Sequence, residues 1–254
     1  MKKFGLESAS SVRTPISPNI KLTIDLLGKS ADSSFYRSMI GSLLYLIVSR
    51  PDISYSVGVC ARYQANPKES QVIALKRIIT YVKTTANFSV WYSKDTNDVL
   101  AGYFDADWAK NVDNRKSTSG GCFFVGHNLV SWMSKKQNSI LLCIAEAEYI
   151  VAGSCSTQLL WMQNLLHDYG ICQEHLTIYY DNTSAINIFK NPVQHSRTKH
   201  IEIRHHFIRE LIEDDTFTLE FIHTDDQKVD LFTKPLDSKW FEFLCQNIGV
   251  ISMD

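Results

Sequence analysis

The sequence predicts an α/β protein: a mixed five-stranded sheet with flanking helices, preceded by a small helical segment. Three observations support this class. Residues 35–85 carry apolar side chains at helical spacing, five short apolar runs after residue 96 are typical of strands, and helical patterns separate some of those runs. Elements of these two kinds bury their apolar faces by packing helices on the faces of a sheet.

The composition is that of an ordinary globular chain. Of its 254 residues, 44% are hydrophobic and 21% are charged, and the formal net charge is −1. Because this charge is nearly balanced, a nucleic-acid site would have to be a local patch. The six cysteines include no Cys-x-x-Cys pair, which argues against a zinc site and fits reduced thiols in the cytoplasm or nucleus. The longest apolar run, 43–48, is too short to span a bilayer, and the first residues do not resemble a signal peptide.

Residues 1–34 are predicted to be an extended linker with little fixed structure of its own. Pro15 and Pro18 stand there among Ser, Thr and Asn, which favours solvated, extended backbone.

Three helices are predicted between residues 35 and 85. The first covers 36–46, and Pro51 suits the first position of the second, where its missing N–H costs nothing. Asn66 is the expected N-cap of the third, with Glu69 completing a capping box. A short strand is expected over 88–92.

From about residue 96 the pattern changes to strands and helices. Strands are predicted over 99–104, 122–125, 129–133, 176–180 and 217–222. Helices are predicted over 145–167, 184–189 and 201–212, and from 229. Gly126 lies between the second and third strands and predicts a hairpin there.

Four carboxylates fall where such a sheet could bring them together. Asp105 and Asp181 each follow a strand, and sites in open α/β sheets gather beyond strand ends. Glu148 lies in the first turns of the long helix, and Asp230 stands between apolar neighbours, where a buried carboxylate is costly unless a cation joins it. Hard divalent cations prefer oxygen ligands, and a pair of them about 4 Å apart can assist phosphodiester hydrolysis. The residues alone leave a simpler alternative open, in which each acid is a solvated side chain or a helix cap.

Nine motifs in a fixed order narrow these alternatives. They are YRSMIGSLLYL (36–46), SRPDISYSVGVCARYQANPKESQ (49–71), GYFDADWA (102–109), DNRKSTSGGCFF (113–124), SWMSKKQNSI (131–140), AEAEYI (145–150), YYDNTSAI (179–186), RTKHIEIRHHFIRE (197–210) and DQKVDLFTKPL (226–236). In these motifs nearly the whole chain resembles the end of the reverse transcriptase region in Pol polyproteins of plant copia-type LTR retrotransposons.

The resemblance implies a domain organisation and a fold. It predicts a reverse transcriptase thumb and connection segment over 35–95, a ribonuclease H domain with a ribonuclease H-like fold over 96–235, and a helical C-terminal tail over 236–254. The paired aspartates of the polymerase are absent from this sequence, so the chain is not expected to polymerise DNA by itself.

The resemblance also implies roles for the four acids. Asp105 of DADW, Glu148 as the second glutamate of EAE, Asp181 of YDN and Asp230 of VDLFTK are expected to be catalytic and to bind two Mg²⁺ ions, for which Mn²⁺ can substitute. The expected reaction is hydrolysis of the RNA strand of an RNA–DNA hybrid. Asp107 is interpreted as polar support or a turn residue and Glu146 as a surface residue, both pointing away from the chosen four.

Further residues are candidates for substrate contact. Phosphate contacts are expected from a loop and from a basic stretch, which could instead be a solvated helix face: Arg115, Ser117 and Thr118, then Arg197, Lys199 and His200. Sugar hydroxyl contacts are expected from Asn182, Ser184 and Gln227. His223 is a candidate for helping product leave, with an exposed strand-end histidine as the alternative. The expected partners are the hybrid and the polymerase palm and fingers of the same polyprotein, in a cytoplasmic retrotransposon particle or the nucleus, with no membrane.

Some positions depart from the usual run of the family. Phe104 precedes the first acid, Lys110 replaces a usual glycine, and Cys143-Ile144 replaces a Ser-Thr pair ahead of AEAEY. The last change removes a natural N-cap from the helix that carries Glu148, at a cost of roughly 1 kcal/mol. Three hypotheses therefore stand: an active ribonuclease H fragment, a catalytically silent remnant that still folds, and a nucleic-acid-binding module that needs no metal.

Overall fold

The computed structural model describes residues 4, 6, 10–108, 111–138, 144–183, 186 and 202–253, without the side chains of 145, 146 and 202–207. The chain forms two compact units. The helical unit comprises Met1–Trp91, Asn111–Asn114 and Lys234–Asp254, and the sheet unit comprises Tyr92–Lys110 and Arg115–Thr233. No helix in the described part of the chain is both long enough and apolar enough to cross a bilayer.

The helical unit is built on three helices. Its elements are α1 (Ser33–Leu46), the 3-10 turn η2 (Pro51–Ile53), α2 (Ser54–Ala61), α3 (Glu69–Thr84), β1 (Phe88–Val90), α8 (Ser238–Asn247) and β7 (Val250–Ser252). Helix α1 begins where predicted to within a few residues, because Asp32 caps it: its Oδ1 accepts from the backbone N–H of Ser34 at 2.8 Å and of Phe35 at 3.2 Å.

The start of α3 differs from the prediction. Lys68, not Asn66, is the N-cap, and the side chain that reaches back to it is that of Gln71, not Glu69. The Gln71 Oε1 accepts from the Lys68 backbone N–H at 2.7 Å, which satisfies one of the free N–H groups at the helix start. The third helix therefore begins two residues later than Pro67 suggested.

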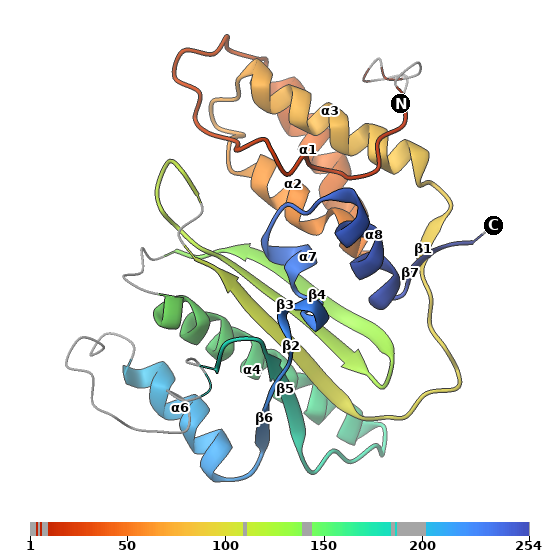
Figure 1. Ribbon diagram of the computed structural model, residues 1–254, viewed down its shortest axis with the longest axis vertical. Helices are drawn as coiled ribbons and strands as arrows, with labels where there is room; N and C mark the ends of the chain where they lie inside the picture. The colour runs from red at the N-terminus through yellow and green to blue at the C-terminus, as the bar shows by residue number, and fades with distance from the viewer. Residues whose placement is uncertain are drawn as a thin grey trace. The chain divides into compact units, whose positions relative to one another are not determined.

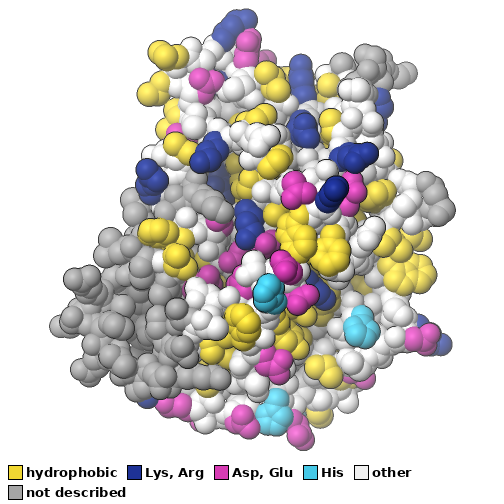
Figure 2. Space-filling view, in the orientation of Figure 1, with side chains coloured by type: hydrophobic (Ala, Val, Ile, Leu, Met, Phe, Trp, Pro, Cys, Tyr) yellow, Lys and Arg dark blue, Asp and Glu magenta, His cyan; other side chains and the backbone are white. Residues whose placement is uncertain are grey.

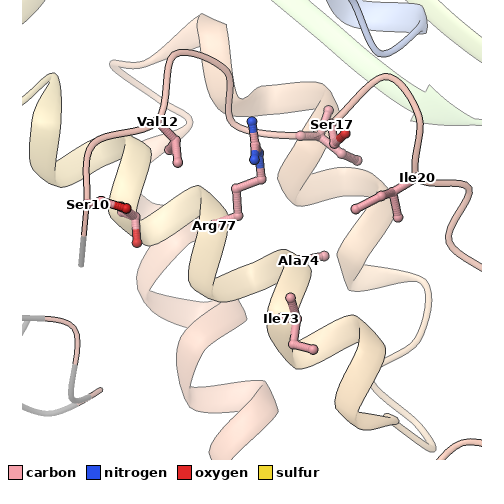
Figure 3. A pocket seen from close by; sticks show the side chains of 9 residues that line it. Ser10, Val12, Ser17, Ile20, Ile73, Ala74 and Arg77 are labelled. Carbon is pink, nitrogen blue, oxygen red and sulfur yellow. The ribbon is translucent and has the colours of Figure 1, made fainter.

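The described part of the predicted linker is packed against the helices. The Tyr63 hydroxyl donates to Leu22 O at 2.8 Å, and Gln71 Nε2 donates to Thr23 O at 2.6 Å. Arg77 holds Thr14 through its Nε, 3.1 Å from the backbone oxygen, and Figure 3 shows its side chain rising from α3 toward the segment. Backbone over 10–31 forms no helix, as expected, but the expectation of a segment without fixed structure is wrong there because these bonds hold it.

The predicted C-terminal tail is also part of the helical unit. Strand β7 pairs antiparallel with β1, with Phe88 opposite Ser252 and Val90 opposite Val250. The rings of Phe241 in α8 and Tyr81 in α3 meet edge to face at 5.7 Å. Residues 236–254 thus complete this unit rather than extend from the sheet unit.

The sheet unit contains the predicted mixed five-stranded sheet. Its strands are β2 (Leu100–Asp107), β3 (Thr118–Val125), β4 (Asn128–Lys136), β5 (Leu176–Tyr180) and β6 (Phe217–Phe221), in the order β4-β3-β2-β5-β6. Strands β2, β3 and β4 pair antiparallel, whereas β5 lies parallel to both β2 and β6. The predicted fold class is confirmed. The predicted helix 184–189 lies outside the described residues except Ile186.

Helices cover the two faces of this sheet unequally (Figure 1). Helices α4 (Ile144–Asp168) and α6 (Glu202–Glu213) lie on one face, where Leu100 and Phe104 of β2 pack with residues such as Cys155 and Leu159. The short helix α7 (Asp230–Thr233) packs on the other face, against β2, β3 and β4. Side chains alternate along a strand, so the odd-numbered residues of β2 point to the α7 face.

Candidate active site

Two of the predicted acids lie near the carboxyl ends of neighbouring parallel strands, Asp105 within β2 and Asp181 directly after β5. In the register of β2 and β5, Tyr103 lies opposite Tyr179, so Asp105 and Asp181 each follow two residues further on. The carboxyl ends of parallel strands lie at the same edge of a sheet, which places both acids at one edge. In the space-filling view, acidic side chains gather over this end of the sheet, beside α7 (Figure 2).

Gln227 joins these two strand ends. Its Nε2 donates to Phe104 O at 3.1 Å and to Asp181 Oδ1 at 3.4 Å, and the side chain is fully buried. The prediction that Gln227 contacts sugar hydroxyls is therefore wrong, because the amide is enclosed and its donors are used within the protein. It acts as an internal brace that orients the Asp181 carboxylate.

Helix α7 holds the third acid and fixes the first. Asp230 opens the helix and is 3% exposed, and Thr233 closes it. The Thr233 hydroxyl donates to Asp105 Oδ2 at 2.7 Å. Because Asp230 and Thr233 are one turn apart, the residue that orients Asp105 and the acid Asp230 belong to one rigid element.

A glycine lets α7 approach the sheet this closely. Gly120 of β3 lies opposite Asp105 in the antiparallel register. A Cβ on Gly120 would lie 2.5 Å from Thr233 Cγ2 and 2.5 Å from Val229 Cγ1, which is far inside van der Waals contact. The absence of a side chain at 120 is thus a condition for the bond between Thr233 and Asp105.

Glu148 lies on α4 with a buried side chain. Its side chain is 3% exposed, and the residue before it, Ala147, accepts a bond at its backbone oxygen from Gln137 Nε2 at 3.0 Å. Burial first, and then the charge of Glu148, raise the pKa of the Tyr180 hydroxyl well above its usual value. Tyr180 directly precedes Asp181, so Glu148 lies close to the end of β5 as well.

Asp107 and Glu146 are the acids nearest in sequence to Asp105 and Glu148, and the structure describes the side chain of Asp107 only. Strand β2 continues through Asp107, so Asp107 falls on the same face as Asp105 and is 8% exposed. The expectations of a turn residue and of a side chain pointing away are therefore wrong, and only the interpretation as buried polar support remains. The side chain of Glu146 lies outside the described residues.

The donor set suits a hard divalent cation, although no closed site is assembled. All four predicted ligands are carboxylates, the oxygen donors that Mg²⁺ prefers, and three of them are tied to one another through Gln227 and α7. Within the part of the chain that the structure describes, no group of three or more His, Cys, Asp or Glu side chains forms a ready metal-binding cluster.

Curated relatives place the chain in a family. It is 35% identical over 260 residues to the retrovirus-related Pol polyprotein from transposon TNT 1-94 of Nicotiana tabacum, covering 99% of this chain. It is 38% identical over 251 residues to the corresponding polyprotein from transposon RE1 of Arabidopsis thaliana, covering 98% of this chain. The chain belongs to the retrovirus-related Pol polyproteins of plant transposons. It spans 19% and 17% of the length of these two relatives.

Solved structures give looser matches to this Pol segment. An RNase H1 from Halobacterium salinarum superposes with a TM-score of 0.38 at 13% identity, over 53% of this chain and 93% of that chain. A foamy viral protease-reverse transcriptase in complex with dsDNA gives 0.47 at 11% identity, over 81% of this chain and 40% of that chain. These superpositions do not by themselves assign an activity. No family model matches the chain.

The predicted substrate residues of the Pol segment differ in exposure. Arg115 is exposed, whereas Ser117 is 1% and Thr118 is 5% exposed. The prediction that these two hydroxyls grip phosphates is therefore wrong for this conformation, because both are enclosed at the start of β3. Asn182 is half-buried, and His223 is an exposed cap of the turn Thr224–Asp226. Four candidates lie outside the described residues: Ser184, Arg197, Lys199 and His200.

The structure describes two of the four positions that depart from the family's usual sequence. Phe104 is fully buried in the α4 face, where its ring meets those of Phe123 and Tyr180, so an aromatic residue there is explained by packing. Ile144 is exposed at the start of α4. Lys110 and Cys143 lie outside the described residues.

Sequence reasoning missed two residues that organise the site. Thr233 and Gly120 carry no charge and match no reactive type, so nothing in their chemistry marks them. One signal was present for Thr233: it stands three residues after Asp230, on the same side of a helix. No comparable signal exists for Gly120, because its role depends on a helix more than 100 residues away in the chain.

Proposed function

We propose that the sheet unit hydrolyses the RNA strand of an RNA–DNA hybrid by two-metal catalysis. Asp105, Glu148, Asp181 and Asp230 would hold two Mg²⁺ ions, or Mn²⁺ in their place. Such a pair of ions supplies an activated water and stabilises the leaving oxygen. As part of a Pol polyprotein, the unit would act beside the polymerase palm and fingers of the same chain, in a cytoplasmic particle or the nucleus.

One observation carries the proposal. Buried polar residues with no other evident task orient the predicted ligands: Thr233 bonds Asp105, and Gln227 bonds Asp181 and the backbone of Phe104. Neighbouring groups that orient carboxylates in this way are characteristic of metal sites, where they fix the geometry of the ligands. A solvated surface acid would need no such bonds. Membership of the Pol polyprotein family supports the same conclusion.

The protein's own residues have defined tasks in this scheme. The Thr233 hydroxyl donates to Oδ2 of Asp105 and so restrains the orientation of the carboxylate that would bind a metal ion. Gln227 restrains Asp181 without adding charge, so the site keeps the negative charge that attracts divalent cations. Glu148 and Asp230 are each 3% exposed, and burial disfavours the charged form of a carboxylate, so a bound cation would offset part of that cost.

The test is cleavage of an end-labelled RNA–DNA hybrid by the purified chain with Mg²⁺. Asp105→Asn keeps the shape of the side chain and removes its charge, so cleavage should fall by at least about 100-fold while hybrid binding in the absence of cleavage persists. Asp95→Asn is the matched control, because Asp95 is an exposed acid of the same unit, and it should cleave like the original chain. Duplex DNA and single-stranded RNA should stay intact.

The alternative of a silent remnant is favoured by one observation, the lack of a ready metal cluster among the described residues. It predicts a cooperative thermal melt with no cleavage at any Mg²⁺ or Mn²⁺ concentration. A metal-independent binding module predicts hybrid binding without cleavage, unchanged by Asp105→Asn. Either result would overturn the proposed hydrolysis.

A further inference from the structure

A pair of stacked tyrosines lies beside the acids on the same face of the sheet. The rings of Tyr103 and Tyr179 are 4.6 Å apart with an interplanar angle of 26°. Tyr103 and Asp105 are two residues apart on β2 and therefore share a face, and Tyr179 precedes Asp181, the residue directly after β5, by two positions. One such step along a strand is about 7 Å. Both rings are half-buried, so part of this aromatic surface faces solvent.

Lys228 lies over this aromatic surface. Its Nζ is 4.9 Å from the centre of the Tyr103 ring and 4.4 Å from the centre of the Phe124 ring, within the range of cation–π attraction. Phe124 is buried and meets Tyr103 edge to face at 5.5 Å, so the surface under the ammonium is rigid. Lys228 also follows Gln227 directly, which ties its backbone to the two strand ends.

The side chain of Lys228 is half-buried. No ion pair of Lys228 is present among the described residues, although the half-buried side chain is partly removed from water. A partly dehydrated cation that lies over Tyr103, on the face of the sheet that carries Asp105, is suited to an anion that the protein does not itself supply.

We propose that Lys228 binds a backbone phosphate of the hybrid strand next to the phosphodiester that is cut. This inference rests on the proposed function and names a residue that positions its substrate. The rings of Tyr103 and Phe124 fix where the ammonium lies. Because Tyr103 lies two residues before Asp105, the phosphate bound by Lys228 is distinct from the phosphate at the acids. Contacts of this kind set the register of a strand without reading its sequence.

The test measures the salt dependence of hybrid binding. In an Asp105→Asn background, which prevents cleavage, the affinity for a fluorescent RNA–DNA hybrid is measured by anisotropy over a range of KCl concentrations. Lys228→Met keeps the apolar stem on the rings and removes the charge, so the slope of log affinity against log salt should decrease in magnitude by about one. Lys228→Arg should restore the slope.

Lys94→Met is the matched control, because Lys94 is an exposed lysine of the same unit without an aromatic floor, and its slope should stay unchanged. A thermal melt of each variant checks folding, and the arginine variant keeps the test valid if Lys228→Met melts early. Equal slopes for Lys228→Met and Lys94→Met would overturn the inference. The two proposals can fail separately. If the salt slope changes in Lys228→Met but the original chain does not cleave the hybrid, only the proposed hydrolysis is wrong. If the original chain cleaves the hybrid but the salt slope of Lys228→Met is unchanged, only the phosphate contact is wrong.

Discussion

Replacing Gly120 with alanine tests the link between the fold and the candidate site. The added methyl group would lie 2.5 Å from Thr233 Cγ2 and from Val229 Cγ1, and 3.3 Å from Phe232 Cβ. Val229 and Thr233 are β-branched and therefore stiff at χ1, so neither side chain can rotate away at low cost. The steric clash can therefore be relieved only if α7 moves away from β3.

The expected losses of stability and of cleavage rate both follow from the 2.5 Å approach of the added methyl group to Thr233 and Val229. Ordinary contact between carbon atoms needs roughly 3.5–4.0 Å, so α7 must move by about 1 Å or more. Overpacking of this kind typically costs about 1–3 kcal/mol, which lowers the melting temperature of a unit of this size by roughly 4–12 °C. The same movement weakens the bond between Thr233 and Asp105, and a misplacement of about 1 Å can lower a rate by about 100-fold.

The assay combines a thermal melt with cleavage of the labelled hybrid well below the melting temperature. Gly41→Ala is the matched control, because Gly41 lies within α1 and an added Cβ would meet nothing within 4 Å. That substitution should stabilise the helical unit by roughly 0.5–1 kcal/mol and leave cleavage unchanged. If Gly120→Ala melts with the original chain and cleaves within twofold of its rate, the close approach of α7 is not required and the reasoning fails.

Two further predictions concern charged groups away from the site. Arg50 donates from Nε to Asp52 Oδ1 at 2.9 Å and from Nη2 to Asp52 Oδ2 at 2.7 Å, and both residues are buried. Arg50→Met should therefore lower the free energy of unfolding, measured by urea denaturation, by roughly 3–5 kcal/mol. The double variant Arg50→Met with Asp52→Leu should lower it clearly less, because no buried charge is left unpaired, and equal losses would contradict a buried ion pair. The backbone oxygen of Asp215, and then its carboxylate, raise the pKa of His175 above its ordinary 6.5. Protonation is thus favoured in the folded state, and this contribution to stability is present below the ordinary pKa and lost as the pH rises through the raised one. NMR titration should show a lower midpoint for His175 in Asp215→Asn, and identical midpoints would exclude the interaction.

Local pattern determined most of the secondary structure. Strand β5 spans Leu176–Tyr180, as predicted, because alternation of apolar residues and flanking breakers are properties of neighbouring residues. The same holds for the hairpin at Gly126, which adopts the positive φ of +59° that glycine tolerates. Helix starts were less predictable: the cap of α3 moved from Asn66 to Lys68, since several residues near a helix start can satisfy its free N–H groups.

Periodicity and motif order along the chain were enough to predict the fold class, the family and the position of Asp181 directly after a strand, whereas Asp105 lies inside β2, which runs on to Asp107. Which polar residues face the solvent could be read only from the folded chain. Gln227, Ser117 and Thr118 are polar by type but buried, and the segment 10–31 is held by α3. Burial and hydrogen bonding depend on distant partners, as with Thr233 and Asp105, which are 128 positions apart. No local pattern encodes such a pair, so the supports of the site, unlike its acids, became visible only in the fold.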